Sequence, residues 1–278
     1  MDKLISIVTC VYNGSLTIED TILSVIYQNY KNFELLIVDG LSKDNTLDIV
    51  GKYSKKDERI KIISEKDDGI YDAYNKGIRN SSGEIILFVN ADDFLFPNAL
   101  FNISKKFNTK NYSVFAGSIA ILNEKEHYYK KHLRSEIAKH SLTNPTILTP
   151  GICFHKDIFT DIGYFDTSYK ICADFDFISR CINNDVKIQY SDFLINNMRE
   201  GGVSSDMKFE RTKKMEHLKV FNRNSKNINF RFYIKIIKNY IKTIILNYLF
   251  RTTLERKRKS IQDNYIVDKI FWYRKHTN

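Results

Sequence analysis

Short apolar runs alternate with amphipathic stretches over the first part of the chain, and no other feature constrains its fold as strongly. Strands are predicted at residues 4–11, 33–38, 60–64 and 84–89, and helices at 17–26, 42–54 and 70–79. The strands are almost wholly apolar, and the connections are short. Strands of this kind, joined through helices, are typical of a parallel sheet covered on both faces. The sequence therefore predicts an α/β fold.

The pattern changes in the second part of the chain. A helix is predicted at 97–107, strands at 113–122 and 126–130, and a further helix at 173–184. Pro97 suits the first turn of the helix that it opens. After Gly201-Gly202 the chain is predicted to be helical and basic to its end, and the segment 201–204 is either a phosphate-binding loop or a hinge.

Four of the predicted strands end in polar residues. These are Tyr12 and Asn13, then Asp39, then Asp67 and Asp68, and finally Asn90, Asp92 and Asp93. In parallel α/β sheets, ligands bind beyond the carboxyl ends of the strands. We therefore expect the four groups to meet at one edge of the sheet and to form a binding site there.

Asp92 and Asp93 come directly after the fourth predicted strand. A carboxylate in this position is held by the sheet and faces solvent, which suits Mg²⁺ or Mn²⁺, and such an ion would neutralise a pyrophosphate and help it leave. The alternative is that either residue caps the helix that Pro97 opens. The acidic residues after the neighbouring strands favour the metal site.

The formal net charge of +10 is distributed unevenly. Residues 1–200 contain 24 Lys and Arg against 27 Asp and Glu, a balance of −3, whereas residues 201–278 contain 19 against 6, a balance of +13. A uniformly basic nucleic-acid binder would not show this division, so we expect no nucleic-acid partner. A mildly acidic body with a basic tail must be explained instead.

Composition excludes several further classes of protein. Apolar residues make up 43% of the chain, too many for a disordered protein, and no apolar run approaches the roughly 18 residues that span a bilayer. The four cysteines lack C-x-x-C spacing and the six histidines lack metal-ligand spacing, so we expect neither a disulfide framework nor a zinc site. A reduced, cytoplasmic protein fits these features.

Six motifs follow one another along the chain at residues 5–14, 36–46, 68–77, 83–93, 163–166 and 173–176. In this order they resemble the family 2 glycosyltransferases of GT-A fold, and most closely the non-processive bacterial members that build surface polysaccharides. The resemblance implies a GT-A-like, Rossmann-like catalytic domain at 1–205 with a mostly parallel sheet flanked by helices. Its nucleotide-binding half would span about 1–95 and its acceptor half about 96–205. Residues 206–278 would form the helical basic tail.

The resemblance also implies a role for each matching residue. The nucleotide-binding residues would be Thr9, Tyr12, Asn13, Asp39, Asp67 and Asn90, and the metal ligands would be Asp92 and Asp93. Asn90 departs from the family pattern, because the family's D-x-D metal motif begins with an acid. An amide brings no charge to a metal ion, so Asp93 would supply the missing charge.

Asp174 matches the family's catalytic base, although Ala173 stands where the family usually has Glu. A sugar hydroxyl is a poor nucleophile, so a positioned carboxylate must take its proton as it attacks the anomeric carbon. Without the resemblance, Asp174 would be interpreted as an ordinary acid favoured at a helix N-terminus by the helix dipole. Asp176 and Arg180 lie four residues apart on the same predicted helix, and we expect them to form a structural pair.

The tail contains an amphipathic segment at residues 230–250. Its Lys and Arg residues lie on one helical face and most of its Ile and Tyr residues on the opposite face, and a basic cluster follows at 256–259. We expect residues 230–259 to contact an anionic membrane surface. The alternative is that the apolar face docks on the catalytic domain or on a second copy, which would make a homo-oligomer.

Together these features predict an inverting glycosyltransferase that uses Mg²⁺ or Mn²⁺ at the inner face of the cell membrane. Its donor would be a nucleotide-sugar, in particular a UDP-sugar, and its acceptor a polyprenyl-diphosphate-linked glycan of bacterial polysaccharide biosynthesis. Two alternatives stay open. A sugar-phosphate nucleotidyltransferase usually carries an early Gly-rich phosphate loop, which this chain lacks between Thr9 and Thr21. The departure from the family pattern at Asn90 keeps open a non-catalytic nucleotide-sugar-binding scaffold.

Overall fold

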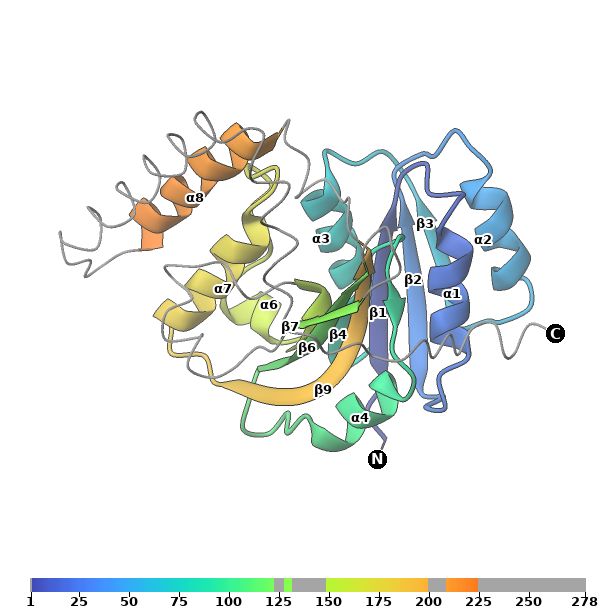
Figure 1. The fold of residues 1–278 in the computed structure, drawn as a ribbon, viewed down its shortest axis with the longest axis horizontal. Coiled ribbons are helices and arrows are strands. Elements are labelled where there is room, and N and C mark those ends of the chain that lie inside the picture. The colour runs from blue at the N-terminus through green and yellow to red at the C-terminus, as the bar shows by residue number, and fades with distance from the viewer. Residues whose placement is uncertain (1, 123–127, 132–148, 200–208, 225–278) are drawn as a thin grey trace.

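The computed structural model describes residues 2–122, 128–131, 149–199 and 209–224 of the chain. Within these ranges, nine strands form a single sheet in the order β3-β2-β1-β4-β8-β6-β9-β5, and β7 pairs with β6 (Figure 1). Helices lie on both faces of this sheet. The prediction of an α/β fold is therefore confirmed.

The elements agree closely with those predicted over the first part of the chain. The strands are β1 (Ile5–Val11), β2 (Phe33–Asp39), β3 (Ile60–Ser64), β4 (Ile85–Phe88), β5 (Phe94–Leu95), β6 (Val114–Leu122), β7 (Tyr128–Lys131), β8 (Ile152–His155) and β9 (Ile188–Arg199). The helices are α1 (Ile18–Ile26), α2 (Thr46–Ser54), α3 (Ile70–Asn80), α4 (Ala99–Lys106), α6 (Ile158–Asp161), α7 (Ala173–Asn183) and α8 (Glu210–Asn224).

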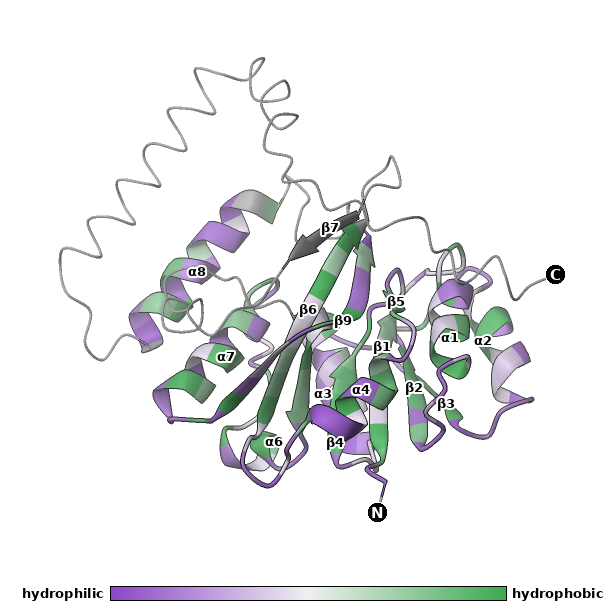
Figure 2. Cartoon of the chain, turned by 60° about the horizontal axis from the view of Figure 1, so that its bottom comes forward, coloured by the Kyte–Doolittle hydropathy of each residue, from purple (hydrophilic) through white to green (hydrophobic). Residues whose placement is uncertain are grey.

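Alternate side chains of the central strands enter two separate hydrophobic cores. In β4, Ile86 and Phe88 pack with residues of α3, α6, α7 and α8, whereas Ile85 and Leu87 pack with residues of α1, α2 and α4. Side chains of a strand alternate between the faces of its sheet, so a strand buried on both faces must be apolar throughout. Figure 2 shows this directly, since β1 and β4 are coloured as hydrophobic along most of their length.

The register of the parallel strands aligns their carboxyl ends at one edge of the sheet. Val11 of β1 pairs with Asp39 of β2, and Asp39 pairs in turn with Ser64 of β3. Strand β4 is parallel to β1, while the strands beyond it pair in mixed directions. The edge at which polar residues were expected to meet is therefore present, and β8, β6 and β9 extend the sheet on its other side.

Two helices begin slightly later than predicted. Thr17 precedes α1 but its side chain makes no capping hydrogen bond. Helix α4 begins at Ala99 rather than at Pro97, because Asn98 before it takes a left-handed conformation with φ of +62°. Strand β5 separates Asp92 and Asp93 from α4 and pairs with β9, so neither aspartate caps that helix.

Helix α8, the first part of the predicted basic tail, packs against α7. Val220 of α8 is fully buried in the same core as α7. The segments 201–204 and 230–259 lie outside the described residues, so the division near residue 205 and the membrane contact stay predictions. Of the helices that the structure does describe, none has both the length and the apolarity needed to cross a membrane.

Gly77 is where α3 approaches β1 most tightly, and replacing it tests this packing. A Cβ atom at Gly77 would clash with the fully buried side chain of Val8, a stiff β-branched residue. Gly77→Ala should therefore lower the free energy of unfolding by about 1–3 kcal/mol. Gly51→Ala in α2 is the matched control, because no atom lies within 4 Å of the added Cβ. The control should raise stability by about 0.5–1 kcal/mol. Urea denaturation measures both, and equal effects of the two variants would contradict the packing argument.

Candidate active site

The loop after β1 is bound to the loop after β2. The backbone N–H of Asn13 donates to Ser42 Oγ at 2.8 Å, and the N–H of Lys43 donates to Asn13 Oδ1 at 2.8 Å. Asn13 has φ of +53°, a conformation that Asn tolerates better than most residues. The two loops therefore form one hydrogen-bonded floor at the edge of the sheet. The side-chain oxygen of Asn13 belongs to this floor, and its contact with a nucleotide stays a prediction.

Asp67 lies beside this floor, against the residue that follows Asp39. The buried carboxylate of Asp39 accepts hydrogen bonds from Ser64 Oγ at 2.8 Å and from the N–H of Ser42 at 3.2 Å. Asp67 lies so close to Gly40 that a Cβ atom there would clash with its carboxylate. Thr9, in contrast, is fully buried within β1, and its hydroxyl has no hydrogen-bond partner among the described residues. Its contact with a nucleotide stays a prediction.

Two apolar side chains are exposed on the same pair of loops. Tyr12 is 59% exposed and Leu41 is 48% exposed. Leu41 also has φ of +62°, which is unusual for a residue with a branched side chain. Exposed apolar groups next to hydrogen-bonding groups suit a flat heteroaromatic ring. Leu41 was not predicted as a site residue, because an isolated leucine in a loop carries no pattern.

Asp93 does not face solvent, which corrects the expectation that it stands beside Asp92 as a metal ligand. It is 1% exposed, and its carboxylate accepts hydrogen bonds from the N–H of Arg199 at 3.1 Å and from the side-chain amides of Asn90 and Asn196. Burial, with a smaller contribution from the charge of Asp92, raises the pKa of Asp93 to about 8. The sequence could not reveal this, because the partners on β9 are about a hundred residues away.

A pair of tyrosines on α3 connects the loop after β4 to the start of α7. Tyr74 donates a hydrogen bond to Asn90 Oδ1 at 2.6 Å, and Tyr71 donates one to Asp174 Oδ1 at 3.2 Å. Burial raises the pKa of Tyr74 well above its usual value, and the charges of Asp174 and Asp92 add to this effect. The predicted base and the segment that carries the predicted metal ligand are therefore hydrogen-bonded to neighbouring tyrosines of one helix.

Sequence reasoning missed these two tyrosines as site residues. They lie three residues apart, which places them on one face of α3, and they fall within the motif at 68–77. That spacing was the available signal. We call Tyr71 and Tyr74 the tyrosine bridge.

Asp174 is half-buried at the second position of α7. Its Oδ1 accepts a hydrogen bond from the N–H of Phe175 at 2.8 Å as well as the one from Tyr71. The tyrosine bridge also contacts the chain before the helix, because the single hydroxyl hydrogen of Tyr71 is shared between Asp174 Oδ1 and the backbone oxygen of Ile171, and the contact with Ile171 is the shorter of the two. These contacts orient one oxygen of the predicted base.

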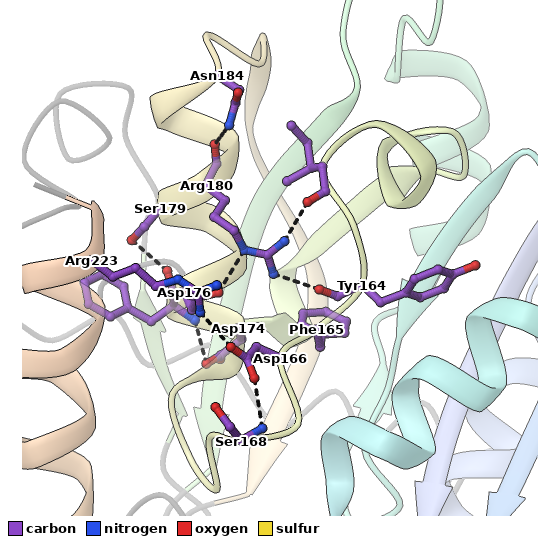
Figure 3. Close-up of polar contacts among 12 residues, drawn as sticks. Tyr164, Phe165, Asp166, Ser168, Asp174, Asp176, Ser179, Arg180, Asn184 and Arg223 are labelled. Atoms are coloured by element: carbon purple, nitrogen blue, oxygen red, sulfur yellow. Dashed lines mark hydrogen bonds and ion pairs between the residues drawn. The ribbon is translucent and has the colours of Figure 1, made fainter. Parts of the chain in front are cut away.

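Asp176 and Arg180 form the structural pair that their spacing predicted. Arg180 Nε donates to the buried carboxylate of Asp176 at 2.8 Å. The same guanidinium donates to the backbone oxygens of Ile162 and Tyr164, at 2.7 and 2.8 Å. Figure 3 shows Arg180 between α7 and the loop that precedes it. The pair therefore holds this loop in place.

The family model of glycosyl transferase family 2 matches residues 6–165, more than half of the chain. This chain belongs to glycosyl transferase family 2. The match spans β1 to β4 and extends into the loop before α7, so it includes both loops of the floor, the tyrosine bridge and the Asn90–Asp93 segment.

Relatives and solved structures extend this result. An uncharacterised glycosyltransferase of Rickettsia typhi is 33% identical over 189 residues, which are 62% of this chain and 57% of that protein. The chain thus spans little more than half the length of this relative. A PGL/p-HBAD biosynthesis glycosyltransferase of Mycobacterium bovis is 26% identical over 85% of this chain and 90% of its own length.

Two solved structures share the fold at low sequence identity. S. aureus TarS 1–349 with UDP-GlcNAc has a TM-score of 0.64 at 21% identity, over 82% of this chain and 67% of that one. The mannosyltransferase PcManGT of Pyrobaculum calidifontis with GDP-Man and Mn²⁺ has a TM-score of 0.62 at 16% identity, over 82% and 65%. These neighbours confirm the predicted GT-A-like fold of the family 2 chain.

The family 2 site offers few protein ligands for a metal ion. Within the described ranges, no three His, Cys, Asp or Glu side chains converge in a cluster that could hold one. Asp92 is half-buried at the edge of the sheet, whereas Asp93 and Asn90 are engaged in the hydrogen bonds described above. A single carboxylate fits a divalent ion that takes its other oxygen ligands from a bound diphosphate and from water.

The raised pKa of Asp93 predicts a pH dependence of stability. Because the fold favours the neutral acid, its contribution is fully present below the unfolded pKa near 3.8 and is lost as the pH rises toward the folded pKa of about 8. Over this range the free energy of unfolding therefore falls by at most about 1.4 kcal/mol for each unit that the pH rises. Asp93→Asn should therefore show a flatter decline than the wild type between pH 5 and pH 8 in urea denaturation. Parallel pH profiles would contradict the assignment.

Proposed function

We propose that this family 2 protein is an inverting glycosyltransferase that moves a sugar from a nucleotide-sugar to a hydroxyl of a lipid-linked glycan. The observation that carries the proposal is the tyrosine bridge, which brings Asp174 and the Asn90–Asp93 segment to one place. One of these groups would act on the acceptor and the other on the donor diphosphate. Transfer of a sugar to a hydroxyl requires both of these roles, one on the acceptor and one on the leaving diphosphate.

In this proposal the floor of the site binds the nucleotide. Tyr12 and Leu41 would contact the face of the base, while Asp39 and Asp67 would contact its polar edge or the ribose. Asn90 would hydrogen-bond the ribose or phosphate. A UDP-sugar is the donor that we favour, and the S. aureus neighbour binds UDP-GlcNAc, whereas the P. calidifontis neighbour binds GDP-Man.

Asp92 would hold Mg²⁺ or Mn²⁺ against the diphosphate of the donor. When bound, such an ion neutralises the charge that develops on the leaving diphosphate. The buried Asp93 would fix the backbone of this segment from beneath rather than bind the ion, because its carboxylate already accepts three hydrogen bonds. The Mn²⁺ in the P. calidifontis structure supports a divalent metal in this fold.

Asp174 would act as the general base. Its carboxylate takes the proton of the acceptor hydroxyl as that oxygen attacks the anomeric carbon and the bond to the diphosphate breaks. A single displacement from the face opposite the leaving group inverts the anomeric configuration. Tyr71 and the N–H of Phe175 hold one oxygen of the carboxylate, which orients the base before the acceptor arrives.

The acceptor is proposed to be a polyprenyl-diphosphate-linked glycan of bacterial polysaccharide biosynthesis. The excess of basic residues in 201–278 supports a location at an anionic membrane surface, where a lipid-linked acceptor would be found. Family membership argues against the alternative of a nucleotidyltransferase. A non-catalytic scaffold is the alternative that the experiments below would reveal.

Asp174→Asn tests the base. The donor is UDP-GlcNAc or another UDP-sugar that raises the melting temperature of the protein. Asp174→Asn should lower the rate of UDP release from this donor at least about 100-fold, because Asn cannot accept a proton. Donor affinity should stay within about twofold, since Asp174 acts on the acceptor or on water. Asp185→Asn is the matched control, because it makes the same change at an exposed residue next to α7 whose φ of +54° Asn tolerates. Substantial turnover by Asp174→Asn would refute the assignment.

The metal proposal predicts that the ion binds well only together with the donor. Mn²⁺ alone should shift the melting temperature little, whereas Mn²⁺ with UDP should raise it more than the sum of the two separate shifts. Asp92→Asn should abolish this extra shift and leave the shift with UDP alone unchanged, and Asp185→Asn should retain both. Differential scanning fluorimetry measures each case. A strong shift with Mn²⁺ alone would contradict the proposal, because it would require a complete protein site.

A further inference from the structure

A carboxylate from α8 binds the chain immediately before α7. The N–H of Lys170 donates to Glu216 Oε1 at 2.8 Å, and those of Ile171 and Cys172 donate to Glu216 Oε2 at 2.9 and 3.0 Å. Three successive backbone donors thus point at one side chain that lies more than forty residues later in the sequence.

One of these donors, the N–H of Cys172, belongs to the start of α7, and the other two precede the helix. Backbone N–H groups at the beginning of a helix lack partners within the helix, and the helix dipole favours a negative charge there. The residue before α7 is Cys172, whose side chain provides no capping hydrogen bond. Glu216 binds the N–H of this residue from another element, together with the two N–H groups before it, as an anion held by successive N–H groups.

The segment capped in this way leads directly to Asp174. Tyr71 contacts Asp174 and the backbone oxygen of Ile171 from α3, while Glu216 contacts the backbone of Ile171 from α8. The segment 171–174 is therefore held between two helices that lie on either side of it. We infer that Glu216 is a positioning residue, which sets the place of the catalytic base through the backbone of residues 170–172. This inference rests on the proposed role of Asp174.

Two other contacts of α8 bind residues that lie earlier in the same loop. Arg223 forms an ion pair with Asp166 at 2.6 Å, and Lys219 donates to Ser168 Oγ at 3.1 Å. Figure 3 shows Arg223 reaching Asp166 from α8, at the start of the loop. These contacts join α8 to the loop without touching residues 170–172, so they provide a control for simple docking of the helix.

The test compares Glu216→Gln with Arg223→Gln in the full chain. Glutamine keeps the size of the side chain, but one of its terminal groups is an amide N–H₂ that cannot accept from a backbone N–H. The readouts are UDP release from the UDP-sugar chosen above with Mn²⁺, the KM for that donor, and hydrogen exchange of the amides of 170–172. Glu216→Asp is a second variant, which keeps the charge and shortens the side chain, for use if Glu216→Gln does not fold.

The inference predicts that Glu216→Gln lowers kcat about 10- to 100-fold, leaves the KM for the donor within twofold, and speeds amide exchange at 170–172. Arg223→Gln should keep kcat within about threefold and leave that exchange unchanged. In an Asp174→Asn background, Glu216→Gln should cause no further loss of the residual rate, because the residue acts through Asp174.

Two results with the single variants would overturn the inference and leave the proposed function standing. One is a Glu216→Gln variant whose activity equals that of a wild type that releases UDP. The other is an equal loss of activity in the Glu216 and Arg223 variants. A further loss in the Asp174→Asn background would also show that Glu216 acts elsewhere. A wild-type chain that binds UDP-sugars but releases no UDP would overturn the proposed function, and the inference with it. Hydrogen exchange would then still report whether the cap forms.

Discussion

The tyrosine bridge is the interaction on which the candidate site depends. Tyr71 and Tyr74 are both buried, and a buried phenol must find a hydrogen-bond partner or lose the free energy of its hydration. Their partners are Asp174 and Asn90, which belong to segments more than eighty residues apart in the sequence. The bridge is held in place because Gly77 lets α3 lie against β1. Packing of one helix therefore sets the place of the proposed base relative to the Asn90–Asp93 segment.

The acidic residues at this edge of the sheet differ in how deeply they are buried. Asp39 and Asp93 are enclosed, and each has hydrogen-bond donors from neighbouring loops or strands around its carboxylate. Asp67 and Asp92 are only half-buried. In such a setting hydrogen bonds fix the buried carboxylates in place, while the partly exposed ones have more of their surface open to a ligand. Residues that are equivalent in the sequence thus acquire different roles, and the neighbouring pair Asp92 and Asp93 shows this most clearly.

Helix α8 connects the basic part of the chain to the site. Its Val220 enters the core beneath α7, and its Glu216 caps the backbone that leads to Asp174. The start of the region that was predicted to be a separate tail is therefore part of the scaffold around the proposed base. A tail that contacts a membrane would be joined to the catalytic part through this helix, which gives the charge distribution a structural connection to the proposed chemistry.

The sequence by itself determined the parallel strands, the edge at which polar residues gather, and the family. These features follow from local rules, since a strand buried on both faces must be apolar and must end in a turn. The pairing of Asp176 with Arg180 was also local and was predicted correctly. Tertiary structure alone decided that Asp93 is buried beneath β9, that the tyrosine bridge reaches Asp174, and that Glu216 binds the backbone before α7. Each of these depends on which distant elements pack together, and burial and hydrogen bonding between them leave no periodic pattern in the sequence.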